Sequence, residues 1–320
     1  MAGVQTFLAF AETVKRGSFA EAARELGLSA SAVAKSVGRL EADLGLRLFH
    51  RTTRQVTLTS EGHELYERCR RIVDEIEALR DDASGARAEP SGTLRLNAPI
   101  VLGRMAIVPA LAALVRRYPK IALEVGFSDR YVDLVREGLD AVVRIGHLPD
   151  STLVGRRIGD QTIIVVAAPR YLRERGTPRT PADLAGHLCV VFRNPSTGRP
   201  RPWQFQERQR PIERMPPSSV VMNDGEALVA CVAEGMGLVQ VPDYMATDAL
   251  RTGRLVEVLS RCRPPPLPIS LVYPSTRRVT PRLRALIEAL TAPGVTRMLG
   301  GAGRRVTRPS PSPAARERAG

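Results

Sequence analysis

The 320-residue sequence has few of the patterns that metalloproteins, membrane proteins and common enzymes require. Its four cysteines form no C-x-x-C pair, so we expect buried, reduced thiols. Its four histidines are scattered without ligand spacing, so we expect no metal site. The motifs G-x-S-x-G, H-E-x-x-H and the P-loop are absent, which argues against an enzyme. No apolar run approaches the ~18 residues of a membrane span and no signal peptide is evident, so we expect a cytoplasmic protein without membrane contact.

Acidic residues are fewer than basic ones, 33 against 47, which gives a net charge of +14. A strongly basic chain is typical of proteins with polyanionic partners. The excess is not concentrated where it would favour DNA, because residues 1–59 hold only 8 basic against 5 acidic residues. Residues 60–90 are acidic, with 5 against 9. Net charge is therefore poor evidence for DNA binding, and local motifs have to carry that interpretation.

The stretch from Ser18 to Leu44 predicts two helices joined by a short turn. Ser18 and Glu21 have capping-box spacing, and Gly27 is a typical helix stop. Ser29 is placed to cap the second helix. Four apolar residues recur on one face of that helix: Val33, Val37, Leu40 and Leu44. This arrangement is typical of a helix-turn-helix, whose second helix enters the major groove of DNA.

An ordinary helical hairpin would fit the same two helices, but the flanking sequence favours the DNA-binding motif. Upstream, Val4 to Val14 predicts a third amphipathic helix that ends at Gly17. Downstream, residues 48–58 place a basic turn between two short strand-like runs, which predicts a wing. A basic wing is suited to contact phosphate groups.

The matching residues in this region are Phe7-x-x-Phe10, Gly17-Ser18-Phe19, Ala22-Ala23, Leu26, Ser29, Val33, Leu40-Glu41, Leu44-Gly45, Leu48-Phe49, Arg51, Arg54, Leu58-Thr59 and Gly62. Together they resemble the DNA-binding domain of LysR-type transcriptional regulators. One position departs from the family pattern, which usually has serine before the basic residue in the middle of the recognition helix. The chain has Ala34 before Lys35, so one hydroxyl contact is missing.

The predicted DNA-contacting residues are small, polar or basic positions of the recognition helix and the wing. Lys35, Arg51 and Arg54 are expected to contact phosphate, and Ser31 and Ser36 are expected to read the bases. The full predicted set is Ser29, Ser31, Ala34, Lys35, Ser36, Arg39, Arg51, Thr53 and Arg54.

A long helix is predicted after Thr59, which is placed to cap it. Apolar residues recur along it with coiled-coil spacing. The predicted seam is Leu65, Cys69, Ile72, Ile76 and Leu79. The alternative is a helix that packs on its own domain. In the resembled family this linker helix pairs two subunits, which implies a homodimer on a two-fold symmetric site, and the family also implies tetramers.

Residues after the polar stretch 81–92 alternate between strand-like and helix-like segments, including a predicted helix at residues 130–137, which favours α/β lobes with parallel sheets. Gly235-x-Gly237 follows a helix and precedes a strand, so it is a helix stop and not a dinucleotide-binding loop. Matching residues include Tyr118-Pro119, Asp140, Arg144-x-Gly146, Ala168-Pro169-x-Tyr171-Leu172, Pro178, Asp183-Leu184, His187, Trp203, Gly235-x-Gly237 and Pro242. They resemble the effector-binding domain of the same family, which is built like a periplasmic solute-binding protein.

The expected fold is therefore α/β, with a winged helix-turn-helix, a linker helix and a two-lobed effector domain. The predicted divisions are 1–59 for the DNA-binding domain, 60–90 for the linker helix and hinge, and 91–292 for the effector domain. Residues 293–320 are rich in Gly, Pro, Ser, Ala and Arg and are predicted to form a disordered basic tail.

A small organic anion, such as a carboxylate, is the predicted effector. Strand 93–98 runs into a helix start, strand 219–222 runs into another, and such helix starts offer free N–H groups beyond the ends of strands. Arg144 would add a bidentate partner, unless it forms an internal salt bridge. The predicted effector-binding residues are Pro99, Ile100, Val101, Leu102, Arg144, Asn223, Asp224 and Gly225.

These features predict a ligand-responsive bacterial transcriptional regulator that is not an enzyme and needs no cofactor. The expected partners are double-stranded DNA, a small-molecule effector and further copies of the chain, with RNA polymerase as a candidate. The alternative is a solute-binding protein without a transcriptional role, which the two-lobed domain alone would also fit.

Overall fold

The computed structural model describes residues 3–51, 56–83, 89–134, 136–148, 153–218, 220–275 and 279–300. The chain divides into two compact units. The first holds residues 1–89 and 135–138, and the second holds residues 90–134 and 139–320. The division between 89 and 90 falls one residue before the predicted start of the effector domain.

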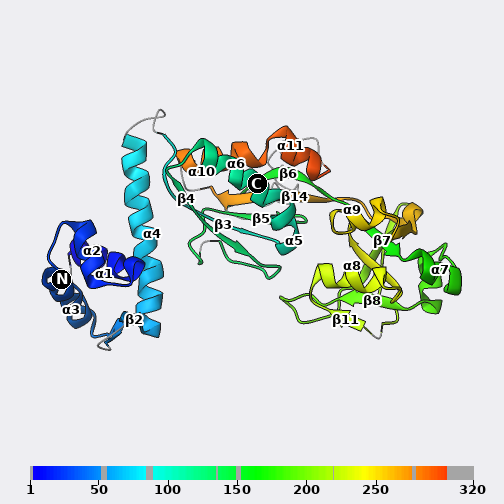
Figure 1. Ribbon diagram of the computed structural model, residues 1–320, viewed down its shortest axis with the longest axis horizontal. Helices are drawn as coiled ribbons and strands as arrows, with labels where there is room; N and C mark the ends of the chain where they lie inside the picture. Colours follow the sequence, from blue (N-terminus) through cyan, green and yellow to red (C-terminus); the bar gives the residue numbers. More distant parts are fainter. Residues whose placement is uncertain are drawn as a thin grey trace, which may run out of the picture. The chain divides into compact units, whose positions relative to one another are not determined.

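The first unit is a three-helix domain with a two-stranded wing, followed by a long helix (Figure 1). Its elements are α1 Val4–Arg16, α2 Phe19–Leu26, α3 Ala30–Leu44, β1 Phe49–Arg51, β2 Val56–Leu58 and α4 Ser60–Ala83. Gly17, Gly27 and Gly45 end the first three helices in the left-handed conformation, with φ between 63° and 65°. Glycine adopts this conformation without steric penalty, so these helix ends follow from the sequence alone.

The core of the first unit lies between α1, α3 and the wing. Val33, Val37 and Leu40 are buried on one face of α3, as predicted. Leu44 was predicted to join them but is 40% exposed at the helix end. The Phe49 ring at the start of the wing packs edge-on against Phe10, with centroids 5.4 Å apart.

The predicted seam of α4 is wrong at its N-terminal end. The Cys69 side chain is buried in the core of its own domain, and Leu65 is partly buried against that core. The alternative of a helix packed on its own domain therefore holds for this part of α4. Ile72 is 51% exposed, while the side chains of Ile76 and Leu79 lie outside the described part of the structure. The seam remains a prediction for Ile72, Ile76 and Leu79.

The second unit consists of two α/β lobes, each built on a five-stranded sheet (Figure 1). We call lobe A the part with β3 Gly92–Ala98, α5 Ile100–Leu102, a π-helical turn Gly103–Ile107, α6 Val108–Arg117, β4 Ile121–Phe127, β5 Ala141–Ile145, β6 Leu153–Gln161, β14 Leu267–Pro274, α10 Pro281–Leu290 and α11 Pro293–Met298. Lobe B comprises β7 Ile163–Ala167, α7 Pro169–Arg175, a 3-10 turn Pro181–Gly186, β8 Cys189–Phe192, β9 Trp203–Glu207, β10 Arg210–Arg214, β11 Val220–Met222, α8 Gly225–Ala233, β12 Leu238–Pro242, α9 Asp243–Arg251, β13 Val256–Val258 and a 3-10 turn Ser260–Cys262.

The sheets are mixed, so the prediction of parallel sheets is only partly right. Lobe A has the order β4-β3-β5-β14-β6, in which β3 runs parallel to β4 and β5. Strand β14 is antiparallel to both of its neighbours. Lobe B has the order β11-β8-β12-β7-β13, with two antiparallel pairings of β7. In lobe A the antiparallel strand is β14, with which the chain returns from lobe B after it has left lobe A through β6.

The chain crosses between the lobes at two adjacent places. Gln161 ends β6 in lobe A, and Ile163 starts β7 in lobe B. The return crossing ends at Leu267, which is paired with Gln161 across the sheet. Two neighbouring crossings are the usual architecture of a hinge around which lobes can open and close.

One predicted helix is wrong. Residues 130–134, 136 and 137 form turns and irregular backbone instead of a helix. The Val132 carbonyl, which an α-helix would pair with the N–H of Arg136, accepts a hydrogen bond from the Arg144 guanidinium at 2.8 Å. A tertiary contact from a neighbouring strand therefore replaces the local bond that helix formation needs.

The predicted boundary of the disordered tail is also wrong. Residues 293–298 form α11, and Leu299 is buried in the core of lobe A. The Leu299 carbonyl accepts a hydrogen bond from the Asp160 N–H at 2.7 Å, which ties this segment to β6. Residues 301–320, the rest of the predicted tail, lie outside the described residues.

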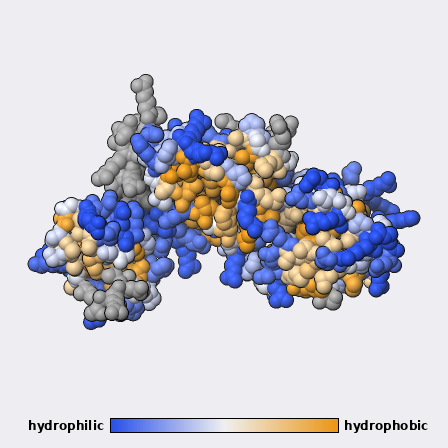
Figure 2. Space-filling model, in the orientation of Figure 1, coloured by the Kyte–Doolittle hydropathy of each residue, from blue (hydrophilic) through white to orange (hydrophobic). Residues whose placement is uncertain are grey.

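The visible surface is largely polar, with apolar side chains gathered over parts of both lobes (Figure 2). Three partly exposed apolar residues of lobe A are Met105, Val108 and Phe127. Within the described residues, no helix is both long enough and apolar enough to span a membrane.

Candidate functional sites

The solvent face of α3 is the first candidate site. Lys35, Arg39 and Ser31 are exposed on this helix, opposite the buried apolar face. Ala34 and Ser36 are half-buried beside them. Helix α2 packs against α3 across a short turn, which gives the arrangement that presents a recognition helix.

Ser29 has a structural role in this motif. Its hydroxyl accepts a hydrogen bond from the Ala32 N–H at 3.2 Å and lies 3.1 Å from the Ser31 hydroxyl. Ser18 caps α2 in the same way, through a 3.5 Å hydrogen bond from the Glu21 N–H. The Glu21 carboxylate forms an ion pair with Arg24. The predicted N-caps at Ser18 and Ser29 are confirmed, and they fix the start of both helices of the motif. The predicted capping box is not completed among the described hydrogen bonds, since the Glu21 carboxylate pairs with Arg24.

Glu41 fastens the wing to the recognition helix, a role that the sequence analysis missed. Its carboxylate accepts hydrogen bonds from the backbone N–H groups of Leu48 (2.8 Å) and Phe49 (3.3 Å). Thr59 holds the other end, because its hydroxyl donates to the Arg47 carbonyl at 2.6 Å and accepts from the Gly62 N–H at 2.9 Å. The predicted cap at Thr59 is thereby confirmed. Glu41 lies eight positions before β1, so its bond to the wing is not a local helix or turn interaction that a sequence pattern indicates.

We expect Glu41→Ala to loosen the wing. The substitution leaves two partly buried N–H groups without their acceptor, which destabilises this segment by about 2 kcal/mol. Native-state hydrogen exchange should show faster exchange of the Leu48 and Phe49 amides. Glu41→Gln retains a side-chain oxygen acceptor and serves as the matched control. Unchanged protection of both amides in Glu41→Ala would contradict the fastening role.

The tip of the wing lies outside the described residues, and with it Thr53 and Arg54. Arg51 is described only by its backbone, which pairs with Val56 across the two strands. This pairing is the predicted hairpin of the wing. That its tip is basic is known from the sequence alone.

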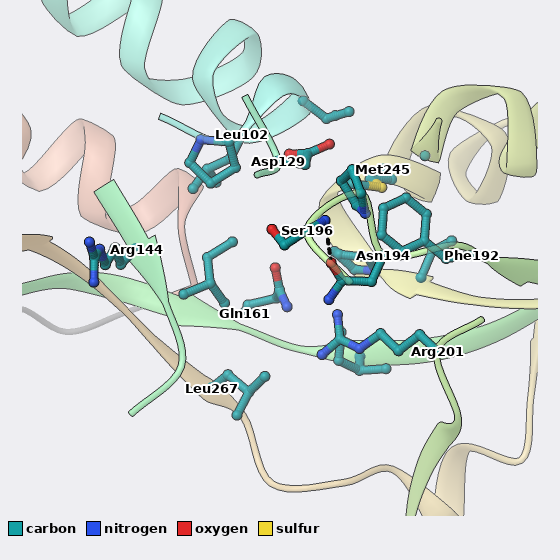
Figure 3. A pocket seen from close by; sticks show the side chains of 18 of the residues that line it. Leu102, Asp129, Arg144, Gln161, Phe192, Asn194, Ser196, Arg201, Met245 and Leu267 are labelled. Atoms are coloured by element: carbon teal, nitrogen blue, oxygen red, sulfur yellow. Dashed lines mark hydrogen bonds between the residues drawn. The ribbon is translucent and has the colours of Figure 1, made fainter. Parts of the chain in front are cut away.

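A cavity of about 660 Å³ between lobe A and lobe B is the second candidate site (Figure 3). Lobe A contributes the ends of β3 and β5, and lobe B contributes the ends of β8 and β12 together with the start of α8. The two crossing segments also line it, at Gln161 and Leu267. A cavity of this size can hold a small organic molecule.

The structure brings some of the predicted effector residues together at this cavity. Five of them line it: Pro99, Val101, Leu102, Arg144 and Gly225. The remaining three, Ile100, Asn223 and Asp224, are not part of its lining.

Both helix starts that were predicted to bind an anion already have carboxylate caps from the chain itself. The Ile100 N–H donates to Asp129 Oδ1 at 3.0 Å. The Asp224 side chain accepts from the Ala227 N–H at 2.8 Å at the start of α8. One N–H group at each of these two helix starts is therefore already occupied by a carboxylate of the chain itself.

Arg144 is held by lobe A itself. Its guanidinium donates to the Tyr131 hydroxyl and to the Val132 carbonyl, both at 2.8 Å, and lies 4.1 Å from the centre of the Tyr131 ring. The alternative prediction for Arg144 was an internal salt bridge. Its described partners are indeed internal, but they are the neutral groups of Tyr131 and Val132 and not an acid. Figure 3 shows Arg144 apart from the polar side chains in the middle of the cavity.

Arg201 is a cavity residue that the sequence analysis missed. It ends a compact loop in which Asn194 N–H donates to the Arg199 carbonyl (2.9 Å) and Arg201 N–H donates to the Phe192 carbonyl (2.8 Å). Figure 3 shows its guanidinium directed into the cavity, near Gln161. The sequence analysis makes no prediction for the arginine- and proline-containing run around it, and only the position of lobe B places Arg201 at the cavity.

Two of the four cysteines are buried, as expected, and two are partly buried. Burial raises the pKa of the Cys69 thiol to about 11 and that of Cys189 to about 12. These two thiols therefore stay protonated and unreactive at neutral pH.

Two family models match the chain, one over each unit. Residues 4–63 match the bacterial regulatory helix-turn-helix protein of the lysR family. Residues 87–293 match the LysR substrate binding domain. Together the two matches cover α3, the cavity and the two lobes that enclose it.

Relatives are similar along most of the chain. The uncharacterized HTH-type transcriptional regulator YcaN of Escherichia coli K12 is 37% identical over 283 residues, covering 88% of this chain and 92% of that protein. The HTH-type transcriptional regulator CrgA of Neisseria meningitidis serogroup B is 33% identical over 282 residues, covering 88% and 93%.

Solved structures share the fold. The structure of CrgA from Neisseria meningitidis, a LysR-type transcriptional regulator, has a TM-score of 0.57 at 32% identity and covers 90% of this chain and 97% of that one. The full-length virulence activator AphB of Vibrio cholerae, a member of the same family, has a TM-score of 0.58 at 25% identity, with coverage of 90% and 98%.

Proposed function

The chain belongs to the LysR family of bacterial transcriptional regulators, and from this premise we propose that it reads a two-fold symmetric operator as a homodimer under the control of an organic acid. The helix-turn-helix domain does not favour the alternative of a solute-binding protein without a transcriptional role. A regulator has to reach DNA, so its place of action is the cytoplasm.

The exposed face of α3 is the observation that carries the DNA-binding part of the proposal. Lys35 and Arg39 contact phosphate groups or base edges, and Ser31 reads a base edge. Arg51, Thr53 and Arg54 extend the contact from the wing to the neighbouring phosphates. Ser29, Ala34 and Ser36 have smaller roles, since Ser29 caps the helix and the other two are half-buried.

A gel-shift assay tests this function. The full-length protein is titrated against DNA that flanks its own gene, with unlabelled random DNA as competitor and at several salt concentrations. Specific retardation that persists in the presence of competitor supports the proposal. Failure to retard this DNA even at low salt, or binding that random DNA removes equally well, would overturn it.

Dimerisation through α4 is the second part of the proposal. Ile72 is about half exposed on a helix whose other described side chains are mostly polar, so it has an apolar surface to bury against a second copy. Ile76 and Leu79 follow it at the same spacing along the sequence.

We expect Ile72→Asp to dissociate the dimer formed through this helix, because it would bury an unpaired charge in the seam, which costs several kcal/mol. Sedimentation equilibrium of the full-length variant should show a lower mass than the wild-type protein. His63→Asp is the control, since position 63 lies on the opposite side of the same helix from position 72. A variant with unchanged assembly would contradict the seam.

The proposal also includes assemblies larger than a dimer and contacts with RNA polymerase. Met105, Val108 and Phe127 are each about 40% exposed on lobe A, and β4 is an edge strand of its sheet. An apolar surface next to an open strand edge is suited to bind another copy of the chain, which supports a tetramer.

The effector part of the proposal rests on the cavity between the lobes. Apolar side chains such as Leu102 and Phe192 line it together with Arg201. This combination fits an organic acid whose carboxylate is bound by Arg201 and whose apolar part faces the walls. Arg144, Pro99 and Val101 shape the cavity, and no separate cofactor is part of the proposal.

A further inference from the structure

Charged side chains of both signs line the cavity. Arg201 enters from lobe B, and Asp129 enters from lobe A. Figure 3 shows them on opposite sides of a polar group formed by Gln161, Asn194 and Ser196. A ligand that fills this space meets a cation and an anion at the same time.

Arg201 is available to a ligand. Within the described residues, its guanidinium takes part in no ion pair, while its backbone N–H is fixed by the Phe192 carbonyl. An arginine with a fixed backbone and an unpaired guanidinium in a cavity is suited to bind a carboxylate through two parallel hydrogen bonds.

Only one carboxylate oxygen of Asp129, Oδ1, has a described hydrogen-bond partner in the protein. Its Oδ1 accepts the Ile100 N–H at 3.0 Å, which holds the carboxyl group in place at the edge of the cavity. The described contacts leave Oδ2 available to a donor on the ligand. A carboxylate that is oriented by the backbone and lines a cavity is a suitable acceptor for an ammonium group.

Both charges act on the same buried side chain. Tyr244 lines the cavity, and its hydroxyl donates to Gln161 Oε1 at 3.0 Å. Burial raises the pKa of Tyr244, Asp129 raises it further, and Arg201 lowers it. The phenol and Gln161 thus form a hydrogen-bonded pair in the lining of the cavity.

The other charged groups of the lining do not change this pattern. Arg144 is bound by Tyr131 and Val132, and the exposed residues Arg130 and His147 line the cavity from lobe A, as the exposed Arg201 does from lobe B. Tyr131 also connects the lobes, since its N–H donates to the Ser196 hydroxyl at 2.8 Å. Figure 3 shows Arg201 and Asp129 at the cavity together with the apolar side chains of Phe192 and Met245.

We propose that the effector is a zwitterion of the amino-acid type, whose carboxylate is bound by Arg201 and whose ammonium group is bound by Asp129. This inference rests on the proposed function, in which the cavity takes an effector acid, and it adds the second charge. A ligand held by both charges connects lobe A to lobe B. It would thereby favour one relative position of the lobes about the two crossing segments.

Isothermal titration calorimetry on the full-length protein tests the inference with matched sets of probes. Each set contains an amino acid, its N-acetyl derivative and its amide, for phenylalanine, leucine and methionine. In at least one set, we expect the free amino acid to bind at least about tenfold more tightly than either derivative, because each derivative lacks one charge-assisted contact.

Variants assign the two charges. Asp129→Asn keeps the acceptor for Ile100 and removes the charge, so it should weaken binding of the amino acid about tenfold and leave its N-acetyl derivative unchanged or tighter. Arg201→Gln should weaken both. Arg199→Gln is the control, since Arg199 lies in the same loop but not in the cavity lining, and its affinities should match those of the wild-type protein.

The possible outcomes separate this inference from the proposed function. Tighter binding of an N-acetyl derivative than of its free amino acid would overturn the proposal of a zwitterion but not the proposal that the effector is an organic acid. Binding of the amides alone, or of no member of any set, would overturn the inference as well. Specific retardation of DNA by the same protein preparation reports on the regulator function independently of all these results.

Discussion

Replacing both Lys35 and Arg39 by alanine is expected to weaken specific DNA binding by at least about thirtyfold, because each lost contact to a base or phosphate contributes about 1–3 kcal/mol. Both side chains are exposed on α3, and the face opposite to them is anchored by the buried residues Val33 and Leu40. The substitutions therefore remove the contacts without disturbing the core. The assay is a gel shift of the full-length variant on the specific DNA.

The salt dependence of binding separates the two kinds of contact. If both side chains bind phosphates, the slope of log affinity against log salt should fall by about 2, since each neutralised phosphate contributes about 0.9. A loss of affinity with an unchanged slope would assign them to base edges. Lys15→Ala on α1 is the control, because Lys15 is an exposed lysine outside α3. Equal effects of Lys15→Ala and Lys35→Ala would contradict the recognition-helix assignment.

Gly237→Ala is expected to destabilise lobe B by about 2–6 kcal/mol. Gly237 has φ +116°, a conformation that side chains with a Cβ rarely adopt, and a Cβ there would lie 2.2 Å from the Leu188 carbonyl oxygen. That oxygen accepts the Leu238 N–H at 2.9 Å, so the clash separates β12 from its neighbour β8. Backbone strain and overpacking each contribute about 1–3 kcal/mol.

Trp203 provides a specific probe for this prediction, because it is the only tryptophan in the chain and is buried in the core of lobe B. Urea unfolding followed by tryptophan fluorescence should show a midpoint about 1 M or more below that of the wild-type protein. Gly186→Ala is the control in the same lobe, since a Cβ at position 186 would meet no atom within 4 Å. A wild-type midpoint for Gly237→Ala would refute the predicted clash.

Elements that depend on local interactions could be predicted from the sequence. Ser18 and Ser29 cap their helices as expected, and Gly17, Gly27 and Gly45 end helices in the left-handed conformation. Each of these features involves residues three or four positions apart, so a single sequence contains the necessary information.

Elements that depend on distant contacts were mispredicted. The irregular backbone at residues 130–134, 136 and 137 depends on the Arg144 guanidinium, and the burial of Cys69 depends on the packing of α4 against α1. The ordered segment at residues 293–300 depends on β6, through the Asp160 N–H. In each case a partner far away in the sequence supplies the hydrogen bond or the apolar contact.

The candidate cavity shows the same division. Val101, Leu102 and Gly225 line it as predicted, because they follow strand ends that any α/β lobe presents on one edge. Arg201 could not be found in this way, since it ends an irregular loop. Asp129 is placed by its bond to the Ile100 N–H, which no sequence pattern indicates.

The sequence by itself determined the helix-turn-helix, its recognition face and the strand ends that border a ligand cavity, because caps, glycine stops and apolar periodicity act over a few residues. Only the tertiary structure decided which charges meet in that cavity. The chain leaves lobe A at Gln161 and returns at Leu267, and this double crossing brings Asp129 and Arg201 to the same cavity although 72 positions separate them. Their roles follow from where the lobes place them, since electrostatic interactions depend on distance in space and not on distance along the chain.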